Sequence, residues 1–329
     1  VQIGLLPFTV NKFFWSETAM GVKFYTDNWY LAWVRGVNTN NTSSSNDWGD
    51  GDLDSLNVRY DLKMEPVKLG LFASYLFENI PSGAVSSATF QTNPHDFNEV
   101  KLFPAGGTSF DLLALGIDGG WSTATNFGKA FINWDFIYET GGVDDVGVSG
   151  NNLDISAYLL HGDFGLNFGK STVTYTVWYA SGDDDDTDSD LKNFMSVDVD
   201  FFDSFIWQES LTDDNVFFEG PDIGDKGMFF NKLALDYAAD KKTKLGIAAL
   251  YLQLAEDVTL ATGKNTKDLG FEIDAYGTYK LYDNVELRLN LAYLFSGDAT
   301  DDLEVGTKAG NGKGDVDIFK SEARVRFQF

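Results

Sequence analysis

Apolar and polar residues alternate along several long stretches of this chain. The clearest stretch is 284–297, where every second side chain is apolar and charged or amide side chains stand between them. One face takes Val285, Leu287, Leu289, Leu291, Tyr293 and Phe295, and the other takes Glu286, Arg288 and Asn290. Because successive side chains of a strand point to opposite faces, this pattern predicts a two-faced β-strand. The stretches 55–64, 267–281 and 315–329 repeat it.

The same criterion predicts an all-β, antiparallel, up-and-down barrel of 14 strands in one domain, 1–329. Tight turns rich in Gly, Asn, Asp and Pro join the strands at one end, and longer connections join them at the other. The first strand is short, so a hairpin before Val1 would raise the count to 16. The predicted strands are 1–9, 17–26, 28–38, 52–64, 66–78, 108–121, 125–138, 151–168, 170–181, 225–238, 242–254, 267–281, 284–297 and 315–329, and the long connections are 10–18, 39–51, 78–107, 139–150, 182–223, 255–266 and 298–313.

Two classes of protein alternate in this way: soluble β-sandwiches or large lipocalin-like barrels, and membrane barrels. A soluble barrel buries its apolar face inside, whereas a membrane barrel turns that face to lipid and keeps its interior polar. Aromatic residues gather near both ends of the predicted strands, as in the aromatic girdles of membrane barrels. The last strand also ends on an aromatic residue, Phe329. In this it resembles the closing strand of bacterial outer-membrane barrels, a family in which a C-terminal aromatic residue marks the chain for insertion.

Composition narrows the function. The chain has 329 residues, no cysteine and a formal net charge of −26. The missing cysteines exclude disulfides and thiolate metal sites, and the acidic balance argues against nucleic acid as a partner. No apolar run approaches the roughly 20 residues of a membrane-spanning helix. The opening at Val1, without a signal peptide, is expected for a mature or trimmed chain.

The five arginines all fall inside predicted strands and are expected to face the barrel interior. If the last strand pairs with the first, they form one basic wall that would steer anions. The alternative is that they pair with interior acids such as Asp61. The predicted pore-lining residues are Lys23, Arg35, Arg59, Lys63, Arg288, Lys320, Arg324, Arg326, Glu272, Asp274, Glu286 and Glu322.

Connection 78–107 resembles the third loop of general porins in position and length. In that family this loop folds into the barrel and narrows it. The resemblance makes Glu78, Asp96 and Glu99 candidate constriction residues, and the alternative is a flap packed on the rim.

Connection 182–223 is the longest and has two parts. Its acidic part, with Asp183, Asp184, Asp186, Asp188 and Asp190, could bind Ca²⁺ through carboxylate oxygens, although a solvated acidic face is the simpler interpretation. Its aromatic part is too apolar for free solvent. We expect it to line the vestibule or to contact a neighbouring protomer.

Catalysis finds little support in the sequence. Neither His95 nor His161 has an identifiable partner for acid–base or nucleophilic chemistry. We therefore expect no enzymatic activity and no cofactor beyond Ca²⁺ at the acidic loops.

The chain as a whole resembles a bacterial outer-membrane porin. The resemblance implies passive diffusion of small hydrophilic solutes or ions through a water-filled lumen. It also implies integral placement in the outer membrane of Gram-negative bacteria, extracellular long loops, contact with lipid and lipopolysaccharide, and a homotrimeric assembly. The rival hypothesis is a structural or adhesive barrel whose acidic loops bind cations or a partner.

Overall fold

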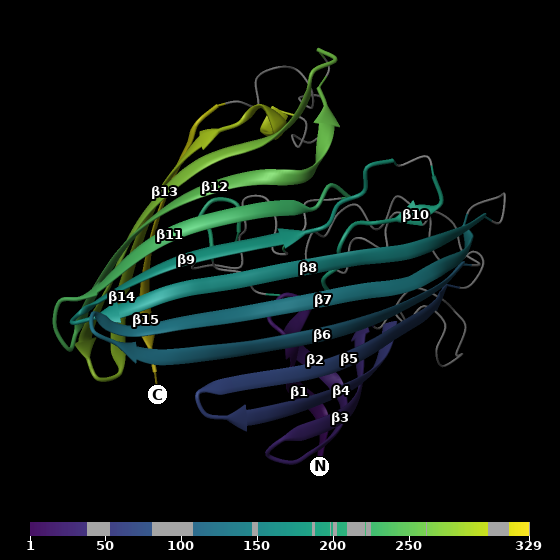
Figure 1. Ribbon diagram of the computed structural model, residues 1–329, viewed down its shortest axis with the longest axis horizontal. Coiled ribbons are helices and arrows are strands. Elements are labelled where there is room, and N and C mark those ends of the chain that lie inside the picture. The colour runs from purple at the N-terminus through teal and green to yellow at the C-terminus, as the bar shows by residue number, and fades with distance from the viewer. Residues whose placement is uncertain are drawn as a thin grey trace. The chain divides into compact units, whose positions relative to one another are not determined.

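The computed structural model is built from antiparallel β-strands (Figure 1). It describes residues 1–37, 53–80, 108–146, 151–185, 188–197, 199, 203–208, 221, 225–260, 262–301 and 316–328. Within this part of the chain the only helical element is a short 3₁₀ helix, η3 (Asp298–Asp301). None of the described residues forms a helix long and apolar enough to span a membrane.

Fourteen strands hydrogen-bond in chain order, each to the next, and a two-residue strand, β10, pairs with β8 in parallel. The predicted all-β, up-and-down sheet is therefore confirmed. Pairing of β15 with β1, which would close the barrel, stays a prediction. The strands are β1 (Gln2–Asn11), β2 (Trp15–Tyr25), β3 (Trp29–Val37), β4 (Leu53–Met64), β5 (Val67–Ile80), β6 (Thr108–Thr125), β7 (Gly128–Val146), β8 (Asn151–Phe168), β9 (Ser171–Ala180), β10 (Asp190–Leu191), β11 (Met228–Ala238), β12 (Thr243–Thr259), β13 (Asn265–Tyr282), β14 (Val285–Ser296) and β15 (Ile318–Phe327).

Short turns join the strands at one end of the sheet, as predicted. In the turn 239–242, the Asp240 carboxylate accepts the backbone N–H groups of Lys242 at 2.7 Å and Thr243 at 2.8 Å. These hydrogen bonds hold the pKa of Asp240 below its usual value. The carboxylate thus closes the turn between β11 and β12.

The prediction of a long connection over 10–18 is wrong. β1 continues to Asn11 and β2 begins at Trp15, so only three residues turn the chain. The Asn11 side-chain oxygen accepts the Phe13 N–H at 2.8 Å, and the Phe13 and Phe14 side chains are fully buried. Because these two side chains are buried, the chain makes a tight turn between β1 and β2 instead of a long exposed loop.

Several strands extend further into the long connections than the alternation predicted. β5 reaches Ile80, β7 reaches Val146 and β12 reaches Thr259. Glu78 therefore belongs to a strand and not to the connection that follows it. Strand pairing satisfies backbone groups whether or not the side chains alternate, so the weak patterns at these ends hid the extensions.

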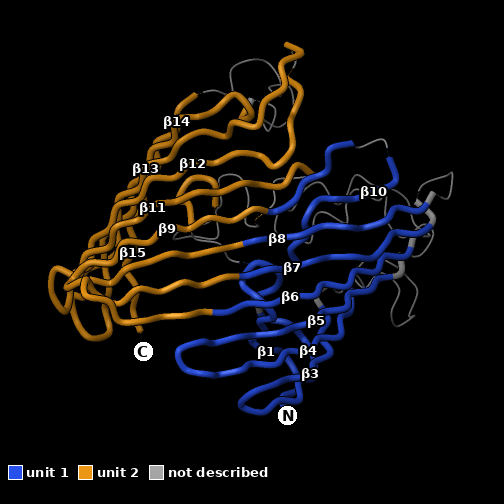
Figure 2. Tube along the Cα trace, viewed as in Figure 1, with its two compact units in different colours: residues 1–119, 135–160, 180–200 blue, residues 120–134, 161–179, 201–329 orange. Residues whose placement is uncertain are grey.

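The chain divides into two compact units (Figure 2). Unit 1 contains 1–119, 135–160 and 180–200, and unit 2 contains 120–134, 161–179 and 201–329. The boundary falls inside β6, β7, β8 and β9, each of which is a continuous strand. The division therefore does not coincide with a linker of the kind that separates domains.

In both units the sheet turns large apolar side chains to the surface. In unit 2, Ile247 is 57% exposed and Leu289 is 50% exposed, whereas Glu272 and Asn290 on the opposite face are at most 1% exposed. We call the two sides the exposed face and the covered face. Apolar side chains such as Leu250 and Leu294, the register partners of Glu272, are also buried on the covered face. A soluble barrel buries its apolar face as a dry core and would not turn many large apolar side chains outward as well.

Candidate functional site

A segment of the longest connection, 203–208, packs against the covered face of unit 2. The Glu272 carboxylate on β13 accepts the Ser204 hydroxyl at 2.7 Å through Oε2. Its Oε1 accepts the backbone N–H groups of Phe205 at 2.8 Å and Ile206 at 3.2 Å. One fully buried carboxylate thus holds three donors of the segment.

The 203–208 segment is also closed upon itself. The Ser204 Oγ accepts the Trp207 N–H at 2.9 Å, and the Gln208 Oε1 accepts the N–H groups of Asp203 and Ser204 at 3.1 and 3.2 Å. Lys232 on β11 donates to the Asp203 carbonyl at 2.6 Å. These bonds fix a compact loop, in which the backbone N–H groups of Phe205 and Ile206 point to Glu272.

A second segment of the same connection, 193–197, packs in unit 1. The Met195 N–H donates to Glu139 Oε2 on β7 at 2.9 Å, and Glu139 is fully buried. The Val197 N–H donates to the Phe14 carbonyl at 2.8 Å, and the Phe194 N–H donates to the Ser181 carbonyl at 2.9 Å. A strand carboxylate therefore anchors the connection in each unit.

These contacts bear on the second expectation for the aromatic part of 182–223, contact with a neighbouring protomer. Phe194, Phe205 and Trp207 are each at most 4% exposed within a single chain. Side chains already buried in their own chain are not available to a neighbouring protomer. Segments 193–197 and 203–208 of the connection pack against strand residues of their own unit, and the expectation that the aromatic part lines the vestibule stays a prediction.

In unit 1, Arg59 lies at the centre of a charged network on the covered face. Its guanidinium donates to both oxygens of Asp118, at 2.5 and 2.8 Å, to Asp61 at 2.9 Å and to the Val10 carbonyl at 2.9 Å. Asn11 donates to Asp135 at 2.6 Å beside it. For Arg59, therefore, the alternative of pairing with interior acids is the one observed.

Strand parity places Arg35 on the same side of β3 as the exposed Leu31, which differs from the predicted placement, although its side chain is only 10% exposed. Its register partners are Met20 on β2 and Asp54 on β4, and it shares its face with the exposed Leu31. It makes two hydrogen bonds of 2.9 Å to Asp54. The prediction failed because β3 is apolar on both faces, so alternation could not show which way an arginine points.

In unit 2, Arg288 and Arg324 stand directly opposite each other on β14 and β15. Thr278 and Lys244 continue the same row across β13 and β12. Arg288 donates to the Asn290 side chain at 3.2 Å, and the Arg324 Nε is buried without a hydrogen-bond partner among the described residues. Neither guanidinium forms an ion pair within that part of the chain. Three cationic side chains thus share one row of the covered face, which we call the basic row.

The other predicted pore-lining residues lie on the covered side of their strands. On β2, Lys23 lies 4.2 Å from the centre of the Tyr30 ring. On β15, Lys320 pairs with Glu322 at 3.1 Å. Register also places the remaining five there: Lys63, Glu272, Asp274, Glu286 and Arg326. Lys63 and Arg326 are nevertheless exposed to solvent, because they lie near the turns.

The predicted loop sites are only partly described. Asp96 and Glu99 of the constriction loop, Asp186 of the acidic part, His95 and Phe329 lie outside the described residues. Lys192 lies among the acids, 2.6 Å from Asp184, and this hydrogen bond raises the pKa of Lys192. Across the described ranges, no three His, Cys, Asp or Glu side chains are placed to hold a metal ion. A calcium site therefore gains no support there.

His161 has a partner that the sequence did not reveal. Its Nε2 lies 3.2 Å from Asp163 Oδ1, and the same carboxylate accepts the Thr176 hydroxyl at 2.7 Å and the Asn133 amide at 3.3 Å. The threonine donates to the acid instead of facing the imidazole, so the geometry is not that of a nucleophile and its base. Absence of enzymatic activity stays a prediction.

Sequence reasoning missed Glu139, Asp118 and Asp135. Each is an acid at a covered position of a strand: Asp135 and Glu139 flank the buried Ile137 on β7, and Asp118 lies between Gly116 and Gly120 on β6. An acid at an alternating apolar position was the available signal, because such a group needs a polar partner from elsewhere in the chain.

No family model and no curated protein matches the chain. Solved structures with a similar arrangement include the siderophore receptor PirA from Acinetobacter baumannii, with 9% identity, a TM-score of 0.43 and coverage of 85% of this chain and 40% of that one. Another is OccK3 (OpdO) from Pseudomonas aeruginosa, with 14% identity, a TM-score of 0.40 and coverage of 85% of this chain and 75% of that one. The toluene transporter TodX from P. putida has 9% identity, a TM-score of 0.30 and coverage of 84% of this chain and 76% of that one. The chain spans about two fifths of the siderophore receptor. All three TM-scores are below 0.5, so these similarities carry no weight for the function of this chain.

Proposed function

We propose that this protein is an outer-membrane β-barrel channel through which small hydrophilic solutes and ions diffuse. The observation that carries the proposal is the exposure of large apolar side chains on one face of the sheet. A sheet that exposes leucine and isoleucine while it covers glutamate, aspartate and asparagine suits a lipid exterior and a polar interior.

Two further features support a membrane location. Exposed aromatic residues stand at the turn end of the sheet, including Phe127, Tyr237 and Tyr282, where a membrane barrel places its interfacial girdle. Short turns at one end and longer connections at the other match the periplasmic and extracellular ends of such barrels. We therefore infer that the long connections are extracellular. Lipopolysaccharide contact and a homotrimer stay predictions.

The channel proposal assigns the 203–208 segment the role of a plug. Glu272 anchors the segment on the covered face, where it would narrow the path of a solute. The rival function is a closed structural barrel, in which 203–208 and 193–197 would block the interior. Single-channel recording in planar bilayers separates the two: discrete conductance steps support the channel, and their absence with correctly inserted protein rejects it.

The basic row predicts the charge preference of the channel. Replacing Arg288 and Arg324 together with Gln should shift the reversal potential in a salt gradient toward cations, because charges in a confined, low-dielectric path are screened less than exposed ones. The charge-matched control is Lys241→Gln with Lys242→Gln in the exposed turn 239–242. Salt screens such charges within about 8–10 Å, so this control should leave the potential unchanged. Equal shifts in both variants would show that the basic row has no special role.

A further inference from the structure

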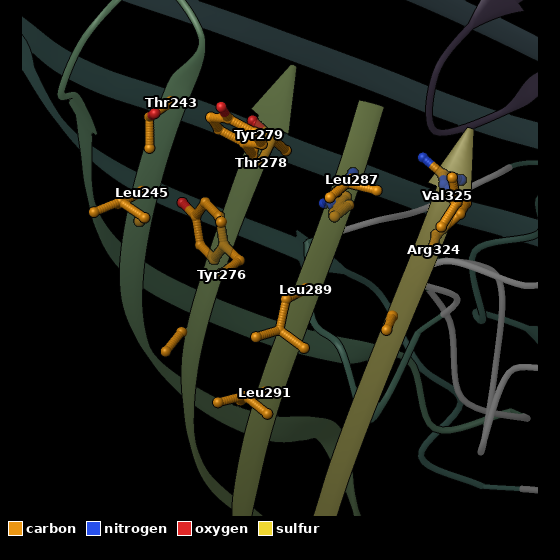
Figure 3. A pocket seen from close by; sticks show the side chains of 15 residues that line it. Thr243, Leu245, Tyr276, Thr278, Tyr279, Leu287, Leu289, Leu291, Arg324 and Val325 are labelled. Atoms are coloured by element: carbon orange, nitrogen blue, oxygen red, sulfur yellow. The ribbon is translucent and has the colours of Figure 1, made fainter. Parts of the chain in front are cut away.

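A groove of about 650 Å³ runs along the exposed face of β12, β13, β14 and β15 (Figure 3). Its central residues, Leu245, Gly277, Leu289 and Ala323, are register partners on the four strands. A leucine alternates with a small residue across this row. Gly277 lies between the two leucines, and Ala323 lies beyond Leu289 on β15.

Gly277 keeps this groove open. It lies inside a strand, where glycine weakens the strand and often marks a close approach by another molecule. It is not among the glycines with positive φ, so the backbone does not require it. A Cβ added at Gly277 would meet Leu245 Cδ2 at 3.1 Å. What the glycine provides here is space beside the leucine.

The groove has the reach of one membrane leaflet. A second depression of about 360 Å³ shares Ala275 and Leu291 with it and continues toward Phe319. Along β13 the two depressions extend from Tyr279 to Ile273, about 20 Å at the usual rise of a strand. With the roughly 45° tilt of membrane strands, this length covers about 15 Å of depth, half of a hydrocarbon core of about 30 Å.

Lysines stand at the turn end of the groove. Thr243 and Tyr279 line that end, Lys242 precedes the first and Lys280 follows the second, and the Lys280 N–H donates to the Lys242 carbonyl at 2.9 Å. The nearby acids are Asp240, whose oxygens already accept the Lys242 and Thr243 N–H groups, Asp283 in the adjacent turn, and Glu286, the register partner of Lys280 on β14. The exposed cations at this end are Lys241, Lys242, Lys280 and Arg326, one more than these three acids. Lys244 belongs to the basic row of the covered face and is not counted.

We propose that this groove binds a phospholipid with an anionic headgroup. Its acyl chains lie along Leu245, Gly277 and Leu289, and its phosphate lies at the lysines of the turn end, since ammonium groups are common phosphate ligands. The inference rests on the proposed membrane location. The groove then prefers anionic phospholipids, whereas the rest of the exposed face contacts lipid without preference.

Native mass spectrometry of the full chain in detergent tests this site. The protein is mixed with phosphatidylglycerol or phosphatidylcholine that carries the same acyl chains. The wild type should retain phosphatidylglycerol several-fold more than phosphatidylcholine. Gly277→Leu with Ala323→Leu should lower retention of both lipids by filling the groove. Lys241→Gln with Lys242→Gln should remove the preference and leave phosphatidylcholine retention unchanged.

The matched control is Ala73→Leu, which enlarges a small residue on the exposed face of β5, opposite the exposed Val58. It should retain lipid as the wild type does. Equal retention of the two lipids by the wild type, or unchanged retention after the groove is filled, would overturn the proposal. Channel recordings on the same proteins keep the two ideas apart: conducting protein without lipid preference rejects the lipid site, and lipid-selective protein without conductance rejects the channel.

Discussion

Replacing Leu289 with arginine is expected to destabilise the membrane-inserted protein by about 2–4 kcal/mol, the usual cost of a lipid-facing arginine near the bilayer midplane. Leu289 is 50% exposed in the middle of β14, and its register partners Gly277 and Ala323 are too small to shelter a guanidinium. The measurement is the urea dependence of folding into phospholipid vesicles.

The control for this variant differs in depth. Tyr282 is 65% exposed at the turn end of β13, so Tyr282→Arg should cost only about 0–1 kcal/mol. The dependence of the cost on depth is what distinguishes a lipid-facing surface from an exposed surface in water. If both substitutions cost the same small amount, the exposed face does not contact the hydrocarbon core.

Replacing Glu272 with glutamine is expected to release the plug and increase single-channel conductance. The carboxylate accepts three donors, from Ser204, Phe205 and Ile206, and hydrogen bonds to a charged group contribute about 1.5–3 kcal/mol each. Glutamine has one acceptor oxygen, and its NH₂ group would face at least one of these donors. The segment should therefore leave its anchored position for part of the time, which recordings would show as larger or fluctuating current.

Glu322→Gln is the matched control for the plug variant. Glu322 also lies on the covered face of unit 2 and its side chain is 13% exposed, but it pairs with Lys320 and not with the 203–208 segment. The control removes the same charge without touching the anchor. Equal conductance changes in the two variants would mean that lost charge, and not release of the segment, alters the current.

The sequence predicted the sheet well because alternation is a local property. The stretch 284–297 was assigned from its own residues, and β14 occupies Val285–Ser296. Prediction failed where local pattern and packing disagree. β3 carries Tyr30, Ala32 and Val34 on its covered face, so both faces are apolar and the direction of Arg35 could not be read.

The anchors of the long connection depend on contacts between distant parts of the chain. Glu272 was predicted to line the interior, but its partner Ser204 lies 68 positions away, and nothing in the sequence links the two. The same holds for Glu139 and Met195, 56 positions apart. The aromatic content of 182–223 correctly indicated burial, because apolar side chains in a connection need cover. It could not indicate which strand residues would accept the backbone donors.

The most direct test of the membrane barrel is a set of spin labels on adjacent positions of β14 and β15. Labels at Leu289 and Val325, on the exposed face, should relax strongly with oxygen, which concentrates in lipid, and weakly with a water-soluble nickel complex. Labels at Arg288 and Arg324, on the covered face, should respond more to nickel than to oxygen. The reverse pattern, with the nickel complex reaching Leu289 and Val325 freely, would contradict a membrane barrel.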